Sequence, residues 1–159
     1  MMREMRYLYF KKWIVMKAIQ HLSEILNEYS PKLRVIGEEE FSRKPSPSKW
    51  SKKEILGHLI DSAANNHQRF IRTQYEDIPS IKYDQDKWVA LNNWQQWSIE
   101  MIIEFWIIYN RRIIEVVKNI PTDKLSLLCN TGKENFTLEY LIDDYVKHME
   151  HHLRQIFDI

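Results

Sequence analysis

Apolar residues recur at intervals of three and four along four long segments of this sequence, and that periodicity predicts α-helices rather than strands. The segments cover residues 12–37, 51–75, 98–120 and the chain from 137 onward. The sequence has three glycines, five prolines and no Asn-Gly or Asp-Gly pair, so a hairpin-rich β architecture has little support. Four amphipathic helices of about 20 residues are typical of a four-helix bundle, and we expect an all-α fold.

Local signals mark where several of these helices begin or break. Ser51 and Glu54 have the spacing of a capping box, so the second helix is expected to begin there. The last helix is expected to open at Thr137, where the flanking apolar residues have the spacing of a hydrophobic staple. In the first helix, Pro31 predicts either a kink or a division into two helices. The third begins with an apolar run, 101–109, which indicates either a central helix or a subunit interface.

About 20 residues, 77–97, separate the second predicted helix from the third. This crossover is longer than most loops, so it is expected to be partly helical or to carry function. The pattern from Tyr83 through Asp84 to Trp88 is typical of the start of a short helix.

Composition and charge exclude several classes of partner. Lysine and arginine number 23 against 22 acidic residues, and no long basic run occurs, so neither a nucleic acid nor an anionic membrane is an expected partner. The single cysteine, Cys129, cannot form an intramolecular disulfide or a thiolate zinc site. A reducing compartment is the simplest interpretation.

Targeting and membrane insertion are not predicted. Lys11 and Lys12 cut short the apolar run near the start of the chain, and no small-residue cleavage site follows. The stretch 101–109 is interrupted by Glu104 and falls well short of the roughly 18 residues that a membrane span needs. We therefore expect a cytoplasmic protein.

Two histidines one helical turn apart, His148 and His152, are candidate metal ligands. Residues four apart lie about 40° apart around a helix, so both imidazoles point the same way. By periodicity alone the pair is either a ligand pair or part of a solvated flank. A third histidine belongs to a polar line that is either a solvated helix edge or part of a site: Glu54, His58, Asp61 and Asn65.

The other three histidines are weaker candidates. His151 is predicted to face outward, His67 lies nearly opposite His58 on the same helix, and His21 neighbours an apolar position.

Three neutral imidazoles suit Zn, Ni or Fe better than Mg or Ca, and three protein ligands leave coordination positions open. Ligating imidazoles are usually oriented by outer hydrogen bonds to carboxylates. Asp61 and Asp144 are the candidates for that role, the alternative being that both are surface charges.

Several motifs resemble the DinB/YfiT-like superfamily, which includes the bacillithiol and mycothiol S-transferases. Residues 47–54 read P-S-K-W-S-K-K-E, similar to the P-x-x-W-S-x-x-E pattern of that family. Residues 57–61 resemble its H-x-x-D element, and residues 147–156 resemble its C-terminal H-x-x-H-H element. Residues 76–79 and 83–88 resemble the crossover of the YfiT-like branch.

The resemblance runs from about residue 22 to the C-terminus and implies a four-helix bundle, often dimeric, with one divalent metal at an end of the bundle. Carried over residue by residue, the ligands are His58, His148 and His152. Zn or Ni is the expected metal, with Fe or Mn as alternatives. Residues 1–11 have no counterpart and form a candidate N-terminal extension of a single domain, 1–159. Residues 129–134 depart from the histidine-bearing stretch of close YfiT relatives, which puts the substrate pocket in question more than the metal.

The leading functional hypothesis is a metal-dependent S-transferase that joins a low-molecular-weight thiol to a small electrophile. A second is a metal-dependent hydrolase of a small amide or ester, with Glu54 or Asp61 as the catalytic base. A third is a non-enzymatic, stress-related binding module that forms a homodimer. In the first hypothesis the tryptophans of the crossover shape the pocket, and the alternative is that they seal the bundle end: Trp88, Trp94 and Trp97.

Overall fold

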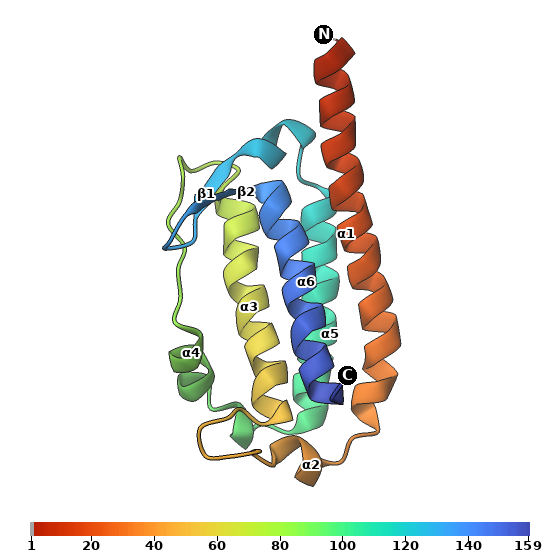
Figure 1. Cartoon of the computed structure of the whole chain (residues 1–159), viewed down its shortest axis with the longest axis vertical. Helices are drawn as coiled ribbons and strands as arrows, with labels where there is room; N and C mark the ends of the chain where they lie inside the picture. Colours follow the sequence, from red (N-terminus) through yellow and green to blue (C-terminus); the bar gives the residue numbers. More distant parts are fainter. Residues whose placement is uncertain (1) are drawn as a thin grey trace.

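Four long helices form a bundle in the computed structural model, which describes residues 2–159 (Figure 1). The bundle helices are α1 (Met2–Arg34), α3 (Lys52–Arg72), α5 (Ile99–Lys118) and α6 (Leu138–Phe157). The shorter elements are helices α2 (Glu38–Ser42) and α4 (Gln85–Asn92), the 3-10 turns η1 (Trp94–Gln96) and η2 (Thr122–Ser126), and strands β1 (Leu128–Asn130) and β2 (Asn135–Thr137). The predicted four-helix bundle is confirmed.

The arrangement of the helices explains the long crossover. α1 and α3 each pack against both α5 and α6, so the consecutive helices α1 and α3 occupy opposite corners of the bundle. In Figure 1, α3 and α5 run in the same direction. Two parallel neighbours need a connection that returns along the bundle, and residues 73–98 supply it. The prediction of a partly helical crossover is confirmed by α4, whose N-cap is Asp84.

The face of α3 that packs into the bundle is partly polar. Its predicted capping box is present, because Ser51 Oγ accepts from Glu54 N at 3.1 Å and Glu54 Oε2 accepts from Ser51 N at 2.8 Å. The polar line that the sequence left as either edge or site is more than nine-tenths buried at every position: Glu54, His58, Asp61 and Asn65. The alternative of a solvated edge is therefore wrong, and because buried polar groups are destabilising unless they find partners, each of these side chains needs a partner inside the protein.

α1 differs from its predicted bounds at both ends. It begins at Met2, so the candidate extension is continuous with the first helix from that residue on. It ends at Arg34 with Pro31 inside it, so the expectation of two separate helices is wrong. A proline three residues from the end of a helix removes one backbone hydrogen bond but has no long following segment to disrupt.

A short hairpin stands where the sequence predicted none. β1 and β2 pair antiparallel, with Leu128 opposite Thr137 and Asn130 opposite Asn135. Asn130 Oδ1 accepts a hydrogen bond from Gly132 N at 2.9 Å, and Gly132 has a φ of +102°, which a glycine adopts without strain. Three-residue strands are too short to leave a detectable alternation in the sequence.

The apolar start of α5 is divided between core and surface. Ile102 and Trp106 are buried, whereas Met101 and Ile108 are 58% and 61% exposed. The alternative of a fully buried central helix is therefore wrong. Within residues 2–159, each helix is too short or too polar to cross a membrane.

Candidate metal centre

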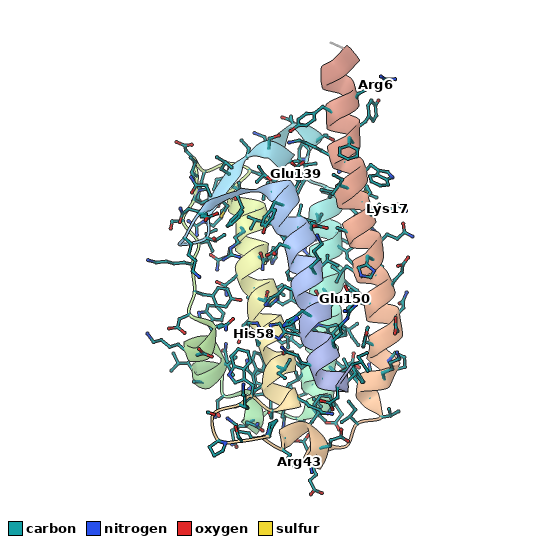
Figure 2. All side chains as sticks on the ribbon, in the orientation of Figure 1. Arg6, Lys17, Arg43, His58, Glu139 and Glu150 are labelled. Atoms are coloured by element: carbon teal, nitrogen blue, oxygen red, sulfur yellow. The ribbon has the colours of Figure 1, made fainter. Side chains whose placement is uncertain are left out.

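Three histidines from two packed helices meet inside the bundle. His58 lies on α3, whereas His148 and His152 lie on α6, and these two helices pack against each other. Figure 2 shows His58 in the lower half of the bundle, beside α6. In the described part of the chain, this is the one group of three or more histidine, cysteine or carboxylate side chains placed closely enough to hold a metal ion.

The imidazoles face one another through their Nε2 atoms. His148 Nε2 lies 3.2 Å from His58 Nε2 and 3.1 Å from His152 Nε2. All three ligand atoms lie within 4.8 Å of one another. Two nitrogens bound to one ion at about 2.1 Å are separated by about 3.0 Å at a right angle and by about 3.4 Å at the tetrahedral angle. The two Nε2–Nε2 separations from His148 fall in this range.

Burial keeps these imidazoles neutral. Burial, with a smaller contribution from the neighbouring histidines, lowers the pKa of His58 from 6.5 to about 3 and the pKa of His148 from 6.5 to about 4. Burial also lowers the pKa of His152, against the hydrogen bond to Gln155 that raises it. A neutral imidazole keeps the lone pair that a metal needs, so at neutral pH the cluster is in its binding form.

The three imidazole nitrogens are better suited to bind one transition-metal ion than to form hydrogen bonds with one another. A neutral imidazole nitrogen carries either one proton or one lone pair, so His148 Nε2 cannot form good hydrogen bonds to both of its neighbours. The buried Nδ1 atoms of His58 and His148 have no hydrogen-bond partner among the residues described. A shared cation would use the Nε2 lone pairs of all three rings at once.

The carboxylates singled out in the sequence are engaged elsewhere. Asp61 accepts hydrogen bonds from Asn92 Nδ2 at 2.8 Å and from Trp94 Nε1 at 3.1 Å. Glu54 caps its own helix and pairs with Lys44 Nζ at 2.8 Å. The expectation that Asp61 orients an imidazole is therefore wrong, because its oxygens fasten the crossover to α3. Its catalytic role and that of Glu54 stay predictions.

Asp144, the other carboxylate expected to orient an imidazole, lies on α6 one turn before His148. In the described chain, no hydrogen bond joins it to a histidine. Burial raises the pKa of its carboxyl group. Its expected orienting contact is therefore absent from this arrangement of side chains.

A cavity of about 530 Å³ opens beside the cluster. His152 lines it, so this ligand connects the cluster with the cavity. Its other walls come from the start of α3, the preceding connector, α4 and the end of α6, and they include Lys49, Trp50, Ile55, Asp86 and Gln155.

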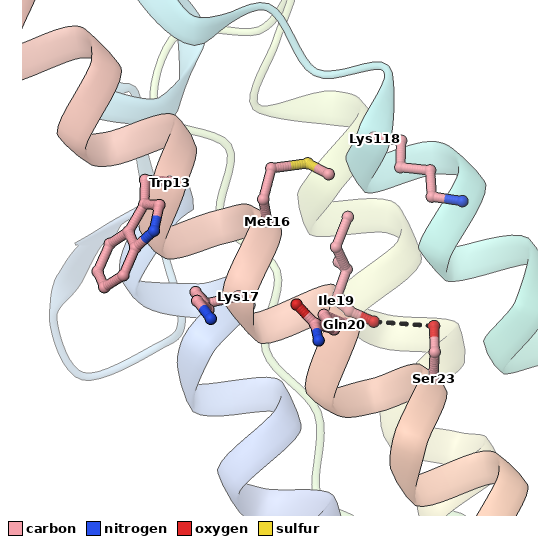
Figure 3. A pocket seen from close by; sticks show the side chains of 7 residues that line it. All are labelled: Trp13, Met16, Lys17, Ile19, Gln20, Ser23 and Lys118. Atoms are coloured by element: carbon pink, nitrogen blue, oxygen red, sulfur yellow. Dashed lines mark hydrogen bonds between the residues drawn. The ribbon is translucent and has the colours of Figure 1, made fainter.

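A second cavity, of about 480 Å³, lies between α1 and α5 (Figure 3). Its lining includes Trp13, Met16, Ile19 and Lys118, and it contains no histidine, cysteine or carboxylate. It therefore offers no set of metal ligands, and we connect function with the cavity at His152.

The family of this chain follows from its sequence. Residues 21–156 match the sequence model of the DinB superfamily. The chain belongs to the DinB superfamily. Its relatives include a protein of Bacillus mycoides strain KBAB4 with 22% identity over 145 residues, which covers 90% of this chain and 83% of the relative. YfiT of Bacillus subtilis strain 168 is 24% identical over 150 residues, covering 90% of this chain and 82% of YfiT. The names of both relatives describe them as candidate metal-dependent hydrolases.

The solved structure of YfiT from Bacillus subtilis has the same fold. It superposes with a TM-score of 0.82 and 22% sequence identity, covering 91% of this DinB-superfamily chain and 84% of YfiT. That structure is described as an unusual four-helix bundle topology. The resemblance to the DinB/YfiT-like superfamily is thus confirmed for family and fold.

The crossover tryptophans lie outside the cavity that they were expected to shape. None of Trp88, Trp94 and Trp97 lines the cavity at His152, whereas Trp50 does, with its ring 4.9 Å from that of His58. Trp94 is 5% exposed and packs over Gly57. For Trp94, the alternative of a sealing residue therefore holds.

We expect Gly57→Ala to destabilise this DinB-superfamily protein by about 1–3 kcal/mol, the range for overpacking a well-filled core. A Cβ atom at Gly57 lies 2.2 Å from Cγ of Trp94, so the indole or the helix has to shift. Chemical denaturation measures the change in the free energy of unfolding. Gly37→Ala is the matched control, because nothing lies within 4 Å of its added Cβ. Equal stability of both variants would contradict the packing described here.

The remaining histidines do not belong to the group of three. His67 Nδ1 is 3.3 Å from the hydroxyl of Tyr109, and His21 lies near Glu150 on the surface. His151 is exposed, as predicted. Gln155, which contacts His152, was not among the residues predicted at the site, although its position three residues after His152 places both on one side of α6.

Proposed function

We propose that this protein is a metal-dependent enzyme that transfers a low-molecular-weight thiol to a small electrophile. The observation that carries the proposal is a cluster of three neutral histidines with a cavity of about 530 Å³ beside it. Structural metal sites are usually closed by four protein ligands, whereas three ligands leave a position for a substrate.

His58, His148 and His152 would hold one divalent transition metal. Imidazole donors favour Zn or Ni, with Fe or Mn as alternatives, over Mg and Ca. When bound, such a metal supplies Lewis acidity that makes a nucleophile from a thiol or from water at neutral pH.

The walls of the cavity suit a small molecule with an apolar part and a charged part. Trp50 and Ile55 offer apolar surface near the cluster, and Trp50 also covers one side of the His58 ring. Lys49 and Asp86 supply one exposed charge of each sign at the same cavity. In this proposal the apolar wall orients the electrophile, and the two charges bind the polar groups of the thiol.

The second candidate is hydrolysis of a small amide or ester, which the names of the relatives favour. Burial raises the pKa of Asp61 to about 6, a value suited to a general base near neutral pH. Both oxygens of Asp61 already accept hydrogen bonds, and Glu54 is held by its helix cap and Lys44. We therefore rank hydrolysis second.

The third candidate is a non-enzymatic homodimeric binding module of the cytoplasm. Exposed apolar residues of α5 favour a homodimer, among them Met101, Phe105 and Ile108. Light scattering of the purified protein gives its mass. A dimer that binds no divalent metal would support this candidate over both enzymes.

The two enzymatic candidates differ in their need for thiol. We expect zinc- or nickel-loaded protein to consume a chromogenic aryl halide only when a small thiol such as cysteine is added. A parallel assay follows the hydrolysis of a nitrophenyl ester without thiol. Metal-dependent turnover of the ester, with none of the aryl halide, would replace transfer by hydrolysis. His21→Ala serves as the control variant, because His21 lies on the surface and outside the cluster.

A further inference from the structure

One of the three clustered imidazoles has a partner on its outer nitrogen. His152 Nδ1 lies 2.8 Å from Oε1 of Gln155. An amide oxygen only accepts hydrogen bonds, so Nδ1 of His152 carries the ring proton and its Nε2 keeps the lone pair. Nε2 is the nitrogen that faces His148, at 3.1 Å. The contact therefore selects the tautomer that metal binding needs.

A second contact of the same amide group is compatible with this orientation. Gln155 Nε2 is 3.0 Å from Nε2 of His151. An amide nitrogen only donates, so His151 Nε2 is its acceptor when the oxygen of Gln155 points to His152. All three residues belong to α6, at spacings of three and four that place side chains next to one another.

The other two imidazoles lack such a contact. Nδ1 of His58 and Nδ1 of His148 are buried with no hydrogen-bond partner in the described chain. These two rings are held by packing, with His58 against Trp50. His152 is only partly buried and is the one ligand of the three that lines the cavity, so packing alone constrains its ring less.

We propose that Gln155 is a positioning residue that holds His152 in the tautomer and orientation required to bind the metal. The inference rests on the proposed metal site and adds a residue to it. Gln155 also lines the cavity, beside His152.

The expected loss of metal affinity on removing Gln155 depends on how exposed this side chain is. Removal of an outer hydrogen-bond partner typically lowers metal affinity by about 10–100-fold. Gln155 is exposed, so water replaces part of the lost contact. We therefore expect a loss of about tenfold, at the low end of that range.

The test compares Gln155→Leu with Gln155→Glu. Leucine keeps much of the side-chain volume but cannot accept from His152, whereas glutamate accepts through a carboxylate oxygen. Affinity for zinc is measured by competition with a chromogenic chelator, and the coordination of cobalt is followed by its visible absorption. We expect Gln155→Leu to lose about tenfold in zinc affinity and to change the cobalt spectrum, and Gln155→Glu to restore both. Arg154→Leu is the matched control, since Arg154 is exposed and pairs with Glu150.

The outcomes separate this inference from the proposed function. Zinc affinity that is unchanged in Gln155→Leu, while the wild type binds zinc, would overturn the positioning role alone. Failure of Gln155→Glu to restore affinity would also overturn it, provided that the metal-free variants melt at the same temperature. A wild-type protein that binds neither zinc nor cobalt would overturn the metal site itself.

Discussion

His148→Ala is expected to lower the affinity for a divalent transition metal by more than about 100-fold, because loss of a ligand exceeds the 10–100-fold loss that follows removal of an outer partner. His148 is the central member of the cluster, with Nε2 atoms of His58 and His152 at 3.2 and 3.1 Å. Its removal leaves two ligands that lie on different helices. Elemental analysis and titration with zinc measure the change.

Thermal stability gives an independent measure of the same loss. A metal present at about 100 times its dissociation constant stabilises the folded protein by about 2.7 kcal/mol. For a chain of this length, that corresponds to a rise of roughly 5–10 °C in the melting temperature. The rise should disappear in His148→Ala and persist in His21→Ala, whose histidine lies on the surface. If His148→Ala retained the full rise, the assignment of the cluster as the metal centre would be wrong.

Acidification is expected to destabilise the metal-free protein by on the order of 4 kcal/mol between about pH 7 and about pH 5. Burial lowers the pKa of His58 to about 3 and the pKa of His148 to about 4, whereas both titrate near 6.5 in the unfolded chain. Below pH 6.5 the unfolded chain takes up protons that the folded chain does not. Stability present at neutral pH is therefore lost as the pH falls toward the folded pKa values.

Urea denaturation of the chelator-treated protein at both pH values measures this slope. The matched variant carries His58→Gln and His148→Gln, so it lacks the two groups but keeps polar side chains of similar length. The difference in slope between wild type and variant isolates their contribution from that of the other titrating groups. Equal slopes would show that the two imidazoles take up protons as readily in the folded chain as in the unfolded one.

Local spacing predicted much of the fold because helix signals act over a few residues. Ser51 caps α3, Thr137 caps α6 and Asp84 caps α4, each through a hydrogen bond from a backbone N–H three residues later. The hairpin at 128–137 and the single α1 helix through Pro31 did not follow from such signals. The short strands depend on neighbours that are distant in sequence, and the effect of a proline depends on how much helix follows it.

The candidate site also has features that local spacing predicted and features that it did not. The helical spacing of His148 and His152 already placed both imidazoles on one side of a helix. The same spacing placed Gln155 beside them, but nothing in it showed that the amide faces His152 rather than solvent. The carboxylates near the cluster were assigned an orienting role by their spacing, yet Asp61 turns to Asn92 and Trp94 instead.

The sequence by itself determined that this chain forms amphipathic helices and that two of its histidines share a helix face. The reason is that both properties depend on a repeat of 3.6 residues within one segment. Only the tertiary structure decided that His58 meets that pair, and that the polar line of α3 is buried rather than solvated. Burial and the meeting of two helices depend on which faces pack together, and packing involves residues 90 positions apart in the chain.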